Sequence, residues 1–339
     1  MSITAGVFSE TQLVHLQGKA DQLWSDRAQK EDYVAQVEVV KAIQAQQTAT
    51  IGTQLRGKKN RTLDISWINA CEIDDSAVTN CTFPTTELST NIQEVELTQE
   101  RQTGFKVREY PFVTNTYDIE EVIAKGLLTA SKVLDEWWAA AIVTAINAAK
   151  GVNEVTVGKG VVAGTDTYVL PSYWNADLVA YFNRVAIMNR IKNPFLLSGN
   201  NLFESVWNAA RERNQAGDES KVMKFGELPI TFDLFNIDTA NTPDLVTYLI
   251  GRGAFAFETK SFYPATPVKY IDQHRYSIAS YNLPGVRYDV HYTNECDSES
   301  DWIDHSFKFK TLGDVFLNPV GCTSTRTNVL SFICGESGS

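Results

Sequence analysis

Residues 118–151 read DIEEVIAKGLLTASKVLDEWWAAAIVTAINAAKG, and this stretch decides the fold. Apolar residues recur in it every three or four positions, which is the period of an α-helix. Asp118 and Glu121 have the spacing of a capping box at the helix start, and Gly151 stands where a glycine commonly ends a helix. A helix over residues 119–150 is about 48 Å long at ~1.5 Å per residue. Because an average helix is roughly three times shorter, we expect this one to serve as a spine.

The segment before this helix combines β-strand patterns with many charges. Residues 62–67 alternate apolar and polar side chains, and residues 92–110 form a second long β-like stretch. Across residues 53–112, charged residues slightly outnumber the large aliphatic residues, phenylalanine and tryptophan taken together. A two-stranded ribbon of this composition is only marginally stable alone. We therefore expect it to lie on a surface, either of its own chain or of a neighbouring copy.

The rest of the chain is mixed in pattern. Residues 1–50 predict a partly helical arm, because the apolar residues from Tyr33 to Ile43 share one helical face. The sequence shows no internal repeat and no long linker between independent domains. Because it contains both helix and strand patterns, the predicted class is α+β. Beyond the spine, helices are predicted over residues 174–191 and 202–214, and strands over residues 152–162, 194–197, 230–235, 245–250, 268–271, 286–292 and 305–316.

Composition and charge exclude several functional classes. The 339 residues are 43% hydrophobic, but no run approaches the ~20 apolar residues of a membrane span. The N-terminus lacks the pattern of a secretion signal, so we expect a cytoplasmic protein that does not associate with a membrane. A net charge of -11 disfavours nucleic-acid binding as the main function. One basic cluster, interpreted as a solvated loop or a contact to an acidic protein surface, consists of Arg56, Lys58, Lys59 and Arg61.

No motif for catalysis or metal binding is complete. The five cysteines form no C-x-x-C pair and are predicted to be reduced, and the four histidines have no ligand spacing. Residues 158–160 lack the serine or threonine that follows the lysine of a phosphate loop, and residues 251–256 lack the βαβ unit of a dinucleotide site. The acidic residues within 297–301 suggest a calcium loop, but Trp302 replaces its glycine. We predict no enzyme activity, no cofactor and no metal site.

The order of these elements resembles the Hong Kong 97 fold, which is the fold of major capsid proteins of tailed bacteriophages. The resemblance covers residues 22–321 and is carried by residues 90–110, which lead into residues 118–151. Residues 248–257, YLIGRGAFAF, look like the glycine-Ala-Phe stretch found late in many such proteins, and residues 229–235 look like the strand before it. The resemblance implies a self-assembling protein of the icosahedral shell that encloses the double-stranded DNA genome of a tailed phage.

The resemblance also implies partners and a location. Subunits are expected to form pentamers and hexamers, with portal, scaffold and decoration proteins as further partners, and to enclose DNA without reading its sequence. The protein is expected in the virion after assembly in the host cytoplasm. The implied organisation is an N-arm (1–50), an extended E-loop (51–115), a P-domain spine helix (116–154), most of the A-domain (155–262), and the P-domain sheet with the C-terminus (263–339). The residues expected at the assembly interface are Arg56, Lys58, Lys59, Arg61, Trp67, Phe105 and Arg108.

Three other interpretations stay open at this point. An encapsulin-like nanocompartment has the same fold but encloses a cargo enzyme in place of a genome. A secreted β-rich adhesin is disfavoured because the chain has no secretion signal. An enzyme of an unrecognised type would contain none of the motifs considered above.

Overall fold

The computed structural model of the chain shows two compact units, which are described separately. The first consists of Met1–Val40, Leu97–Ala140 and Glu258–Asp314, and the second of Lys41–Glu96, Ala141–Phe257 and Val315–Ser339. Both units combine helices with sheet, so the predicted α+β class is confirmed. The residues that the structure describes are 8–26, 33–47, 62–68, 90–109, 118–155, 158–175, 177–191, 193–200, 202–203, 222–225, 228–237, 246–271, 273–296, 303–317 and 328–335.

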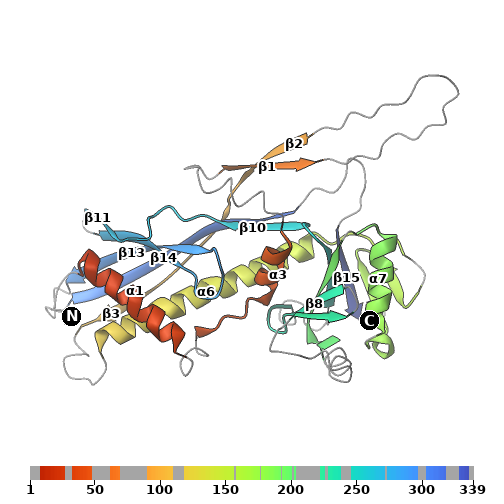
Figure 1. Ribbon diagram of the computed structural model, residues 1–339, viewed down its shortest axis with the longest axis horizontal. Coiled ribbons are helices and arrows are strands. Elements are labelled where there is room, and N and C mark those ends of the chain that lie inside the picture. Colours follow the sequence, from red (N-terminus) through yellow and green to blue (C-terminus); the bar gives the residue numbers. More distant parts are fainter. Residues whose placement is uncertain are drawn as a thin grey trace. The chain divides into compact units, whose positions relative to one another are not determined.

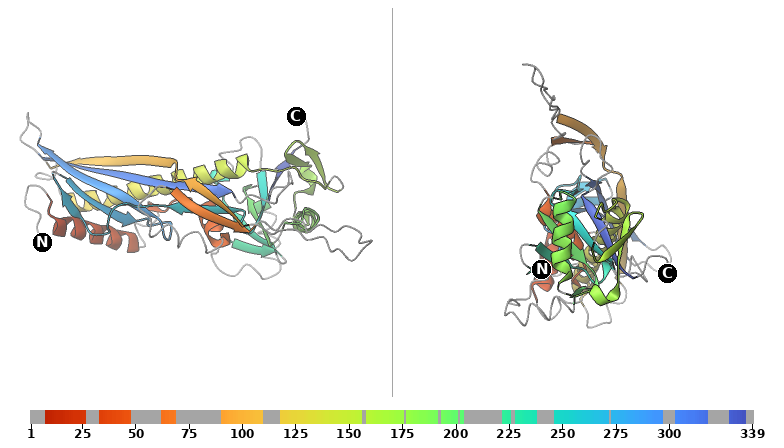
Figure 2. Two further views of the ribbon diagram at one scale, coloured as in Figure 1. Left: turned by 90° about the horizontal axis from the view of Figure 1, so that it is seen from above. Right: turned by 90° about the vertical axis from the view of Figure 1, so that its right-hand side faces the viewer.

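A six-stranded sheet, most of which belongs to the first unit, is organised around its longest strand, β14. β14 pairs antiparallel with β13 and with β3, and Figure 2 (left) shows β3 in yellow-orange beside β14 in blue. The predicted strand at residues 305–316 is thereby confirmed. The strands are β3 (Gln99–Arg108), β10 (Phe255–Thr259), β11 (Val268–Tyr270), β12 (Gln273–Ala279), β13 (Arg287–Cys296) and β14 (Ile303–Leu317).

The spine is helix α6 (Ile119–Ala148), whose 30 residues end two positions before the predicted end. It packs closely on the sheet because a glycine lies opposite a large ring at two contacts, once on the strand and once on the helix. Trp138 donates from Nε1 to the Thr311 hydroxyl at 3.0 Å. A Cβ at Gly313 would lie 2.8 Å from the Trp138 ring, and one at Gly126 would lie 2.6 Å from the ring of Phe105. Glycine therefore permits the close approach of helix and strands.

The predicted capping box of α6 is wrong in its second residue. Asp118 Oδ1 accepts a hydrogen bond from the amide of Glu120 at 3.2 Å, where the prediction named the amide of Glu121. The Glu121 carboxylate instead forms an ion pair with Lys125 at 3.0 Å, one turn further along the helix. The acidic start of the helix still suits the positive end of its dipole.

Helix α1 (Glu10–Ser25) lies beside α6 in the first unit (Figure 1). It begins with a complete capping box: the Ser9 hydroxyl accepts from the Gln12 amide at 3.3 Å, and the Gln12 side chain accepts from the Ser9 amide at 2.8 Å. Its inner face buries Leu13, Leu16 and Ala20. The N-terminal arm therefore contains a helix before residues 33–43. The helical face predicted over residues 33–43 corresponds in part to α3 (Glu38–Gln46).

The second unit is built on a seven-stranded mixed sheet in the order β4-β5-β15-β9-β6-β8-β7. Its central strand β9 is buried along its whole length. Helix α7 (Leu178–Met188) packs on the sheet through Phe182, whose ring lies 4.6 Å from that of Phe332. The strands are β4 (Gly160–Ala163), β5 (Asp166–Val169), β6 (Pro194–Ser198), β7 (Val222–Phe225), β8 (Leu228–Phe232), β9 (Val246–Gly251) and β15 (Val329–Cys334).

Several predicted boundaries move in the second unit. The helix expected at residues 174–191 begins at Leu178, after a short 3-10 helix η2 (Pro171–Tyr173). The strand expected at residues 152–162 begins only at Gly160. Most of the helix expected at residues 202–214 lies outside the described residues. In the part of the chain that the structure covers, no helix is long and apolar enough to cross a membrane.

Candidate assembly interface

The predicted ribbon is present in part, as an antiparallel hairpin of β1 (Thr62–Ile68) and β2 (Thr90–Glu96). The pairing runs in continuous register from Thr62 opposite Glu96 to Ile68 opposite Thr90. Among the described strands, β1 and β2 pair with each other and with no third strand. Within the described part of the chain, both outer edges of the hairpin are therefore unpaired, and such edges are the usual sites at which further strands or chains add to a sheet.

The second half of the expected ribbon lies elsewhere. Residues 92–110 do not form one strand, because β2 ends at Glu96 and β3 pairs with β14 of the same chain from Gln99 to Arg108. For this half, the surface on which the ribbon lies is the sheet of its own chain, which is one of the two alternatives that the sequence left open. A period of two predicts a strand, but it does not identify the neighbour with which the strand pairs.

Two of the predicted interface residues, Phe105 and Arg108, belong to β3. The Phe105 ring stacks on Phe307 of β14, with ring centroids 5.0 Å apart. Arg108 Nε donates to Asp304 Oδ1 at 3.0 Å, and Lys106 Nζ lies 2.6 Å from Asp304 Oδ2. Hydrogen bonds from these two basic side chains lower the pKa of Asp304 to about 2. Both predicted residues thus hold β3 on its own sheet, although Arg108 remains half exposed.

The remaining predicted interface residues lie at or before the hairpin. Trp67 is on β1, opposite Asn91 in the pairing register. The structure therefore places Trp67 on the hairpin, and Phe105 and Arg108 on the sheet of the first unit. The members that fall outside the described residues are Arg56, Lys58, Lys59 and Arg61.

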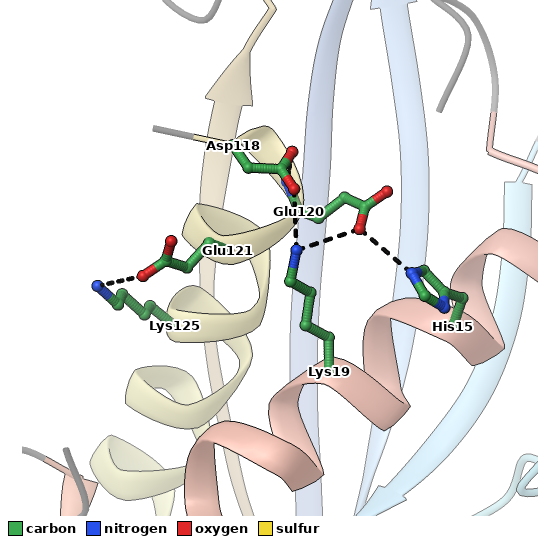
Figure 3. A network of polar contacts seen from close by, with 6 residues as sticks. All are labelled: His15, Lys19, Asp118, Glu120, Glu121 and Lys125. Carbon is green, nitrogen blue, oxygen red and sulfur yellow. Dashed lines mark hydrogen bonds and ion pairs between the residues drawn. The ribbon is translucent and has the colours of Figure 1, made fainter. Parts of the chain in front are cut away.

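A charged cluster joins α1 to the first turn of α6 (Figure 3). Lys19 Nζ lies 2.9 Å from Asp118 Oδ2 and 3.2 Å from Glu120 Oε2, and His15 Nε2 lies 3.2 Å from the same Glu120 oxygen. Partial burial alone would raise the pKa of Asp118, but hydrogen bonds from Lys19 and from the Glu120 amide outweigh it, so this pKa is lowered. The same two carboxylates raise the pKa of Lys19 against the effect of its own burial. The cluster ties the arm to the spine by charge.

A second polar group anchors the chain just before α1. The Tyr292 hydroxyl accepts from the Phe8 amide at 3.1 Å and lies 2.9 Å from His305 Nδ1, while His305 Nε2 lies 3.0 Å from Glu109 Oε1. The Phe8 ring stacks on the imidazole at 4.1 Å between centroids. This carboxylate, imidazole and hydroxyl are aligned like a catalytic relay. However, Tyr292 is 0% exposed and burial raises its pKa to about 12, so this group acts as an anchor.

Exposed apolar side chains mark further surface that sequence reasoning missed. In the first unit, Ile271 is 74% exposed and Tyr270 53% exposed, both at the tip of the β11–β12 hairpin. In the second unit, Ile187 is 71% exposed at the end of α7, next to Met188. Apolar periodicity assigned residues 174–191 to one helix but did not distinguish its buried face from its exposed end. Single exposed apolar residues are ordinary on a protein surface, whereas neighbouring ones more often mark contacts.

No catalytic or metal centre emerges from the described residues. Among them, no group of three or more histidine, cysteine, aspartate and glutamate side chains is placed to hold a metal ion. Cys334 has a free thiol, and burial raises its pKa, which makes it less reactive. Residues 251–256 run from the end of β9 through a turn at 252–254 into β10, and the next element is strand β11, where a dinucleotide site would have a helix. The acidic residues within 297–301 lie outside the described residues.

Comparison with known proteins finds similarity among solved structures alone. No family model and no curated protein matches the chain. The capsid of Ralstonia phage GP4 is similar at 9% identity and a TM-score of 0.47, over 84% of this chain and 87% of that chain. The capsid asymmetric unit of cyanophage Pam1 is similar at 12% identity and a TM-score of 0.46, over 85% and 88%. The capsid of a native GTA particle is similar at 11% identity and a TM-score of 0.45, over 82% and 86%.

Proposed function

We propose that this chain is the major capsid protein of a tailed phage and that its copies assemble into the closed shell around the genome. The observation that carries the proposal is the β1–β2 hairpin, which pairs with no other described strand. A two-stranded sheet is marginally stable in water by itself. A second copy of the chain would supply the surface that the hairpin needs, and closed symmetry would repeat this contact around the shell.

The order of elements supports the same proposal. An N-terminal helix precedes the hairpin, and the long helix α6 follows it and packs on a sheet that receives strands from both sides of α6 in the sequence. This is the order on which the resemblance to the Hong Kong 97 fold rests. A long helix packed on a sheet gives each subunit a stiff body. Flexible or weakly folded extensions can then bind neighbouring copies without deforming that body.

The domain organisation belongs to the proposal, with one adjustment. We assign residues 1–50 to the N-arm, 116–154 to the spine of the P-domain, 155–262 mostly to the A-domain, and 263–339 to the P-domain sheet and C-terminus. The E-loop, expected at residues 51–115, would end near Glu96, because β3 pairs with β14 of the same chain. Arg56, Lys58, Lys59, Arg61 and Trp67 remain proposed contacts to a neighbour.

The proposed partners follow from a shell. Copies of the chain would form pentamers and hexamers, and a portal, a scaffold and decoration proteins would complete the particle. The shell would assemble in the host cytoplasm and enclose DNA without sequence recognition. With a net charge of -11, the chain would repel phosphate backbones and so would let the genome enter and leave.

The test is the assembly state of the purified full-length chain. Electron microscopy and sedimentation should show closed shells, or rings of five and six subunits, at rising protein concentration. A monomer at every concentration would refute the proposal. Particles purified from the natural source distinguish the nearest alternative, because a capsid protects DNA from nuclease whereas a nanocompartment encloses a cargo protein.

A hairpin variant makes the test specific. Ile65→Pro removes a backbone donor in the middle of β1, where Ile65 pairs with Gln93. Because the hairpin pairs with no other described strand, we expect this variant to melt at nearly the native temperature but to lose assembly. The matched control Ile65→Val keeps the strand and should assemble normally. If Ile65→Pro assembles like the native chain, the hairpin is not the contact.

A further inference from the structure

Asp135 is a buried carboxylate within the spine helix α6 and has only uncharged hydrogen-bond donors around it. Its Oδ1 accepts hydrogen bonds from the Ser280 hydroxyl at 2.6 Å and from the Tyr288 hydroxyl. Its Oδ2 accepts from Asn282 Nδ2 at 2.9 Å and from the Ser131 hydroxyl at 3.3 Å. Among the described residues, no lysine, arginine or histidine forms an ion pair with it. A carboxylate that is buried without a cation lowers the stability of the fold while it is ionised.

One of these donors also holds the N-terminal arm. Asn282 Oδ1 accepts a hydrogen bond from the Ala35 amide at 2.9 Å, and its Nδ2 donates to the Tyr33 carbonyl at 3.3 Å as well as to Asp135. An ionised carboxylate can only accept, so Asp135 fixes which end of the Asn282 amide faces it. With Nδ2 directed at Asp135, Oδ1 is placed to receive the Ala35 N–H. The Tyr33 carbonyl accepts from the same Nδ2, so the charge on Asp135 reinforces this orientation of the group that holds the arm.

We propose that Asp135 and Asn282 form a proton-sensitive latch that attaches the arm at residues 33–35 to the first unit. The latch is closed while Asp135 is ionised, because hydrogen bonds to a charged acceptor are about twice as strong as those between neutral groups. When the carboxylate takes up a proton, Asn282 is held less firmly and the Ala35 amide opens more often. The latch belongs to the single chain and does not rest on the proposed shell.

The titration of the latch involves few groups. Burial raises the pKa of Asp135 to about 6, against the opposing effect of its four hydrogen bonds, so the proton is exchanged under mildly acidic conditions. Within the described ranges, Tyr288 on β13 is the other titratable group that forms a hydrogen bond with it. Burial and the neighbouring Asp135 raise the pKa of Tyr288 far above its ordinary value, so the phenol stays neutral. The remaining contacts, from α6 and from the loop after β12, are two serine hydroxyls and an amide, which do not titrate in this range.

Hydrogen exchange at the Ala35 amide tests the latch in the unassembled full-length chain. Protection, corrected for the intrinsic pH dependence of exchange, should fall about fivefold from about pH 7.5 to about pH 5. In Asp135→Asn the protection should not change with pH, and in Asn282→Ala it should be lost at both pH values. The Ala149 amide, which directly follows α6 and donates to the Ala145 carbonyl of its last turn, serves as an internal control and should not respond.

Three results would overturn the latch, and two of them concern its pH dependence. One is a native chain in which protection of the Ala35 amide is the same at both pH values. The other is an Asp135→Asn variant that keeps the native pH response. If that variant does not fold, the pH dependence of protection in the native chain and the Asn282→Ala variant still decide. The third result is an Ala35 amide that stays protected in Asn282→Ala, which contradicts the proposed contact. Shell formation plays no part in these measurements, so failure of the latch and failure of the proposed function are distinguishable.

Discussion

Replacing Asp135 by asparagine should change the way in which the stability of the first unit depends on pH. Burial raises the pKa of Asp135 from its ordinary value of 3.8 to about 6 in the folded chain. A carboxyl group with a higher pKa in the folded state binds more protons there, so the folded state is penalised once the group ionises. At ~1.36 kcal/mol per pKa unit, the free energy of unfolding of the native chain falls by about 3 kcal/mol as the pH rises from below the unfolded pKa to above the folded pKa.

About 2 kcal/mol of this loss falls between about pH 4.5 and about pH 7.5. Asparagine cannot ionise, so the free energy of unfolding of Asp135→Asn, minus that of the native chain, should rise by this amount over the same interval. The comparison at two pH values cancels any constant cost of rearranged hydrogen bonds. Urea unfolding of unassembled subunits, followed by tryptophan fluorescence, measures both values.

The matched control is Asp177→Asn, at an exposed position just before α7. The free energy of unfolding of this variant, minus that of the native chain, should be the same at both pH values. If the Asp135→Asn difference is also constant, the carboxylate is not held in a desolvated state and the reasoning fails. Acidification is thus expected to stabilise the fold through Asp135 while it loosens the arm, so the two measurements on this residue have opposite signs.

Two further predictions concern the sheet of the first unit. Gly313→Ala should lower the free energy of unfolding by about 1–3 kcal/mol, because the new Cβ would overlap the Trp138 ring and a backbone oxygen. Gly335→Ala meets no atom within 4 Å and is the control in the same urea titration; equal values for the two variants would contradict the packing argument. Two basic side chains of β3 lower the pKa of Asp304 from 3.8 to about 2. Its stabilising effect is therefore fully present above pH 3.8 and is lost as the pH falls from there through the folded pKa of about 2. Asp304→Asn should therefore lower the melting temperature near neutral pH and reduce the loss of stability in acid, and an unchanged acid profile would count against these ion pairs.

Local patterns predicted the elements whose signals are local. The spine helix was located to within two residues at its end, because its apolar period continues over many turns and outweighs any single position. The long strand β14 was found for the same reason, from a sustained period of two. Helix α1 was missed, although Ser9 and Gln12 have the spacing of a capping box that could have identified it.

The placement of the predicted interface residues could not be obtained in this way. Phe105 and Arg108 have the alternation of a half-buried strand, which fits a projecting ribbon and an inner strand equally well. Only the pairing of β3 with β14 decides between them, and Arg108 and Asp304 are 196 positions apart in the chain. Strand pairing over such a separation depends on the whole fold, since no local pattern records which edge is vacant.

The sequence by itself determined a long helical spine, strands of known period and the absence of complete catalytic motifs. It also placed Asp135 within that helix, where an acidic residue has no special meaning until its surroundings are known. Tertiary structure alone decided that Asp135 is buried, because Ser280 and Asn282, which cover it, lie 145 and 147 positions further along the chain. Periodicity reports which face of an element is apolar, whereas desolvation of a charge depends on what packs against that face.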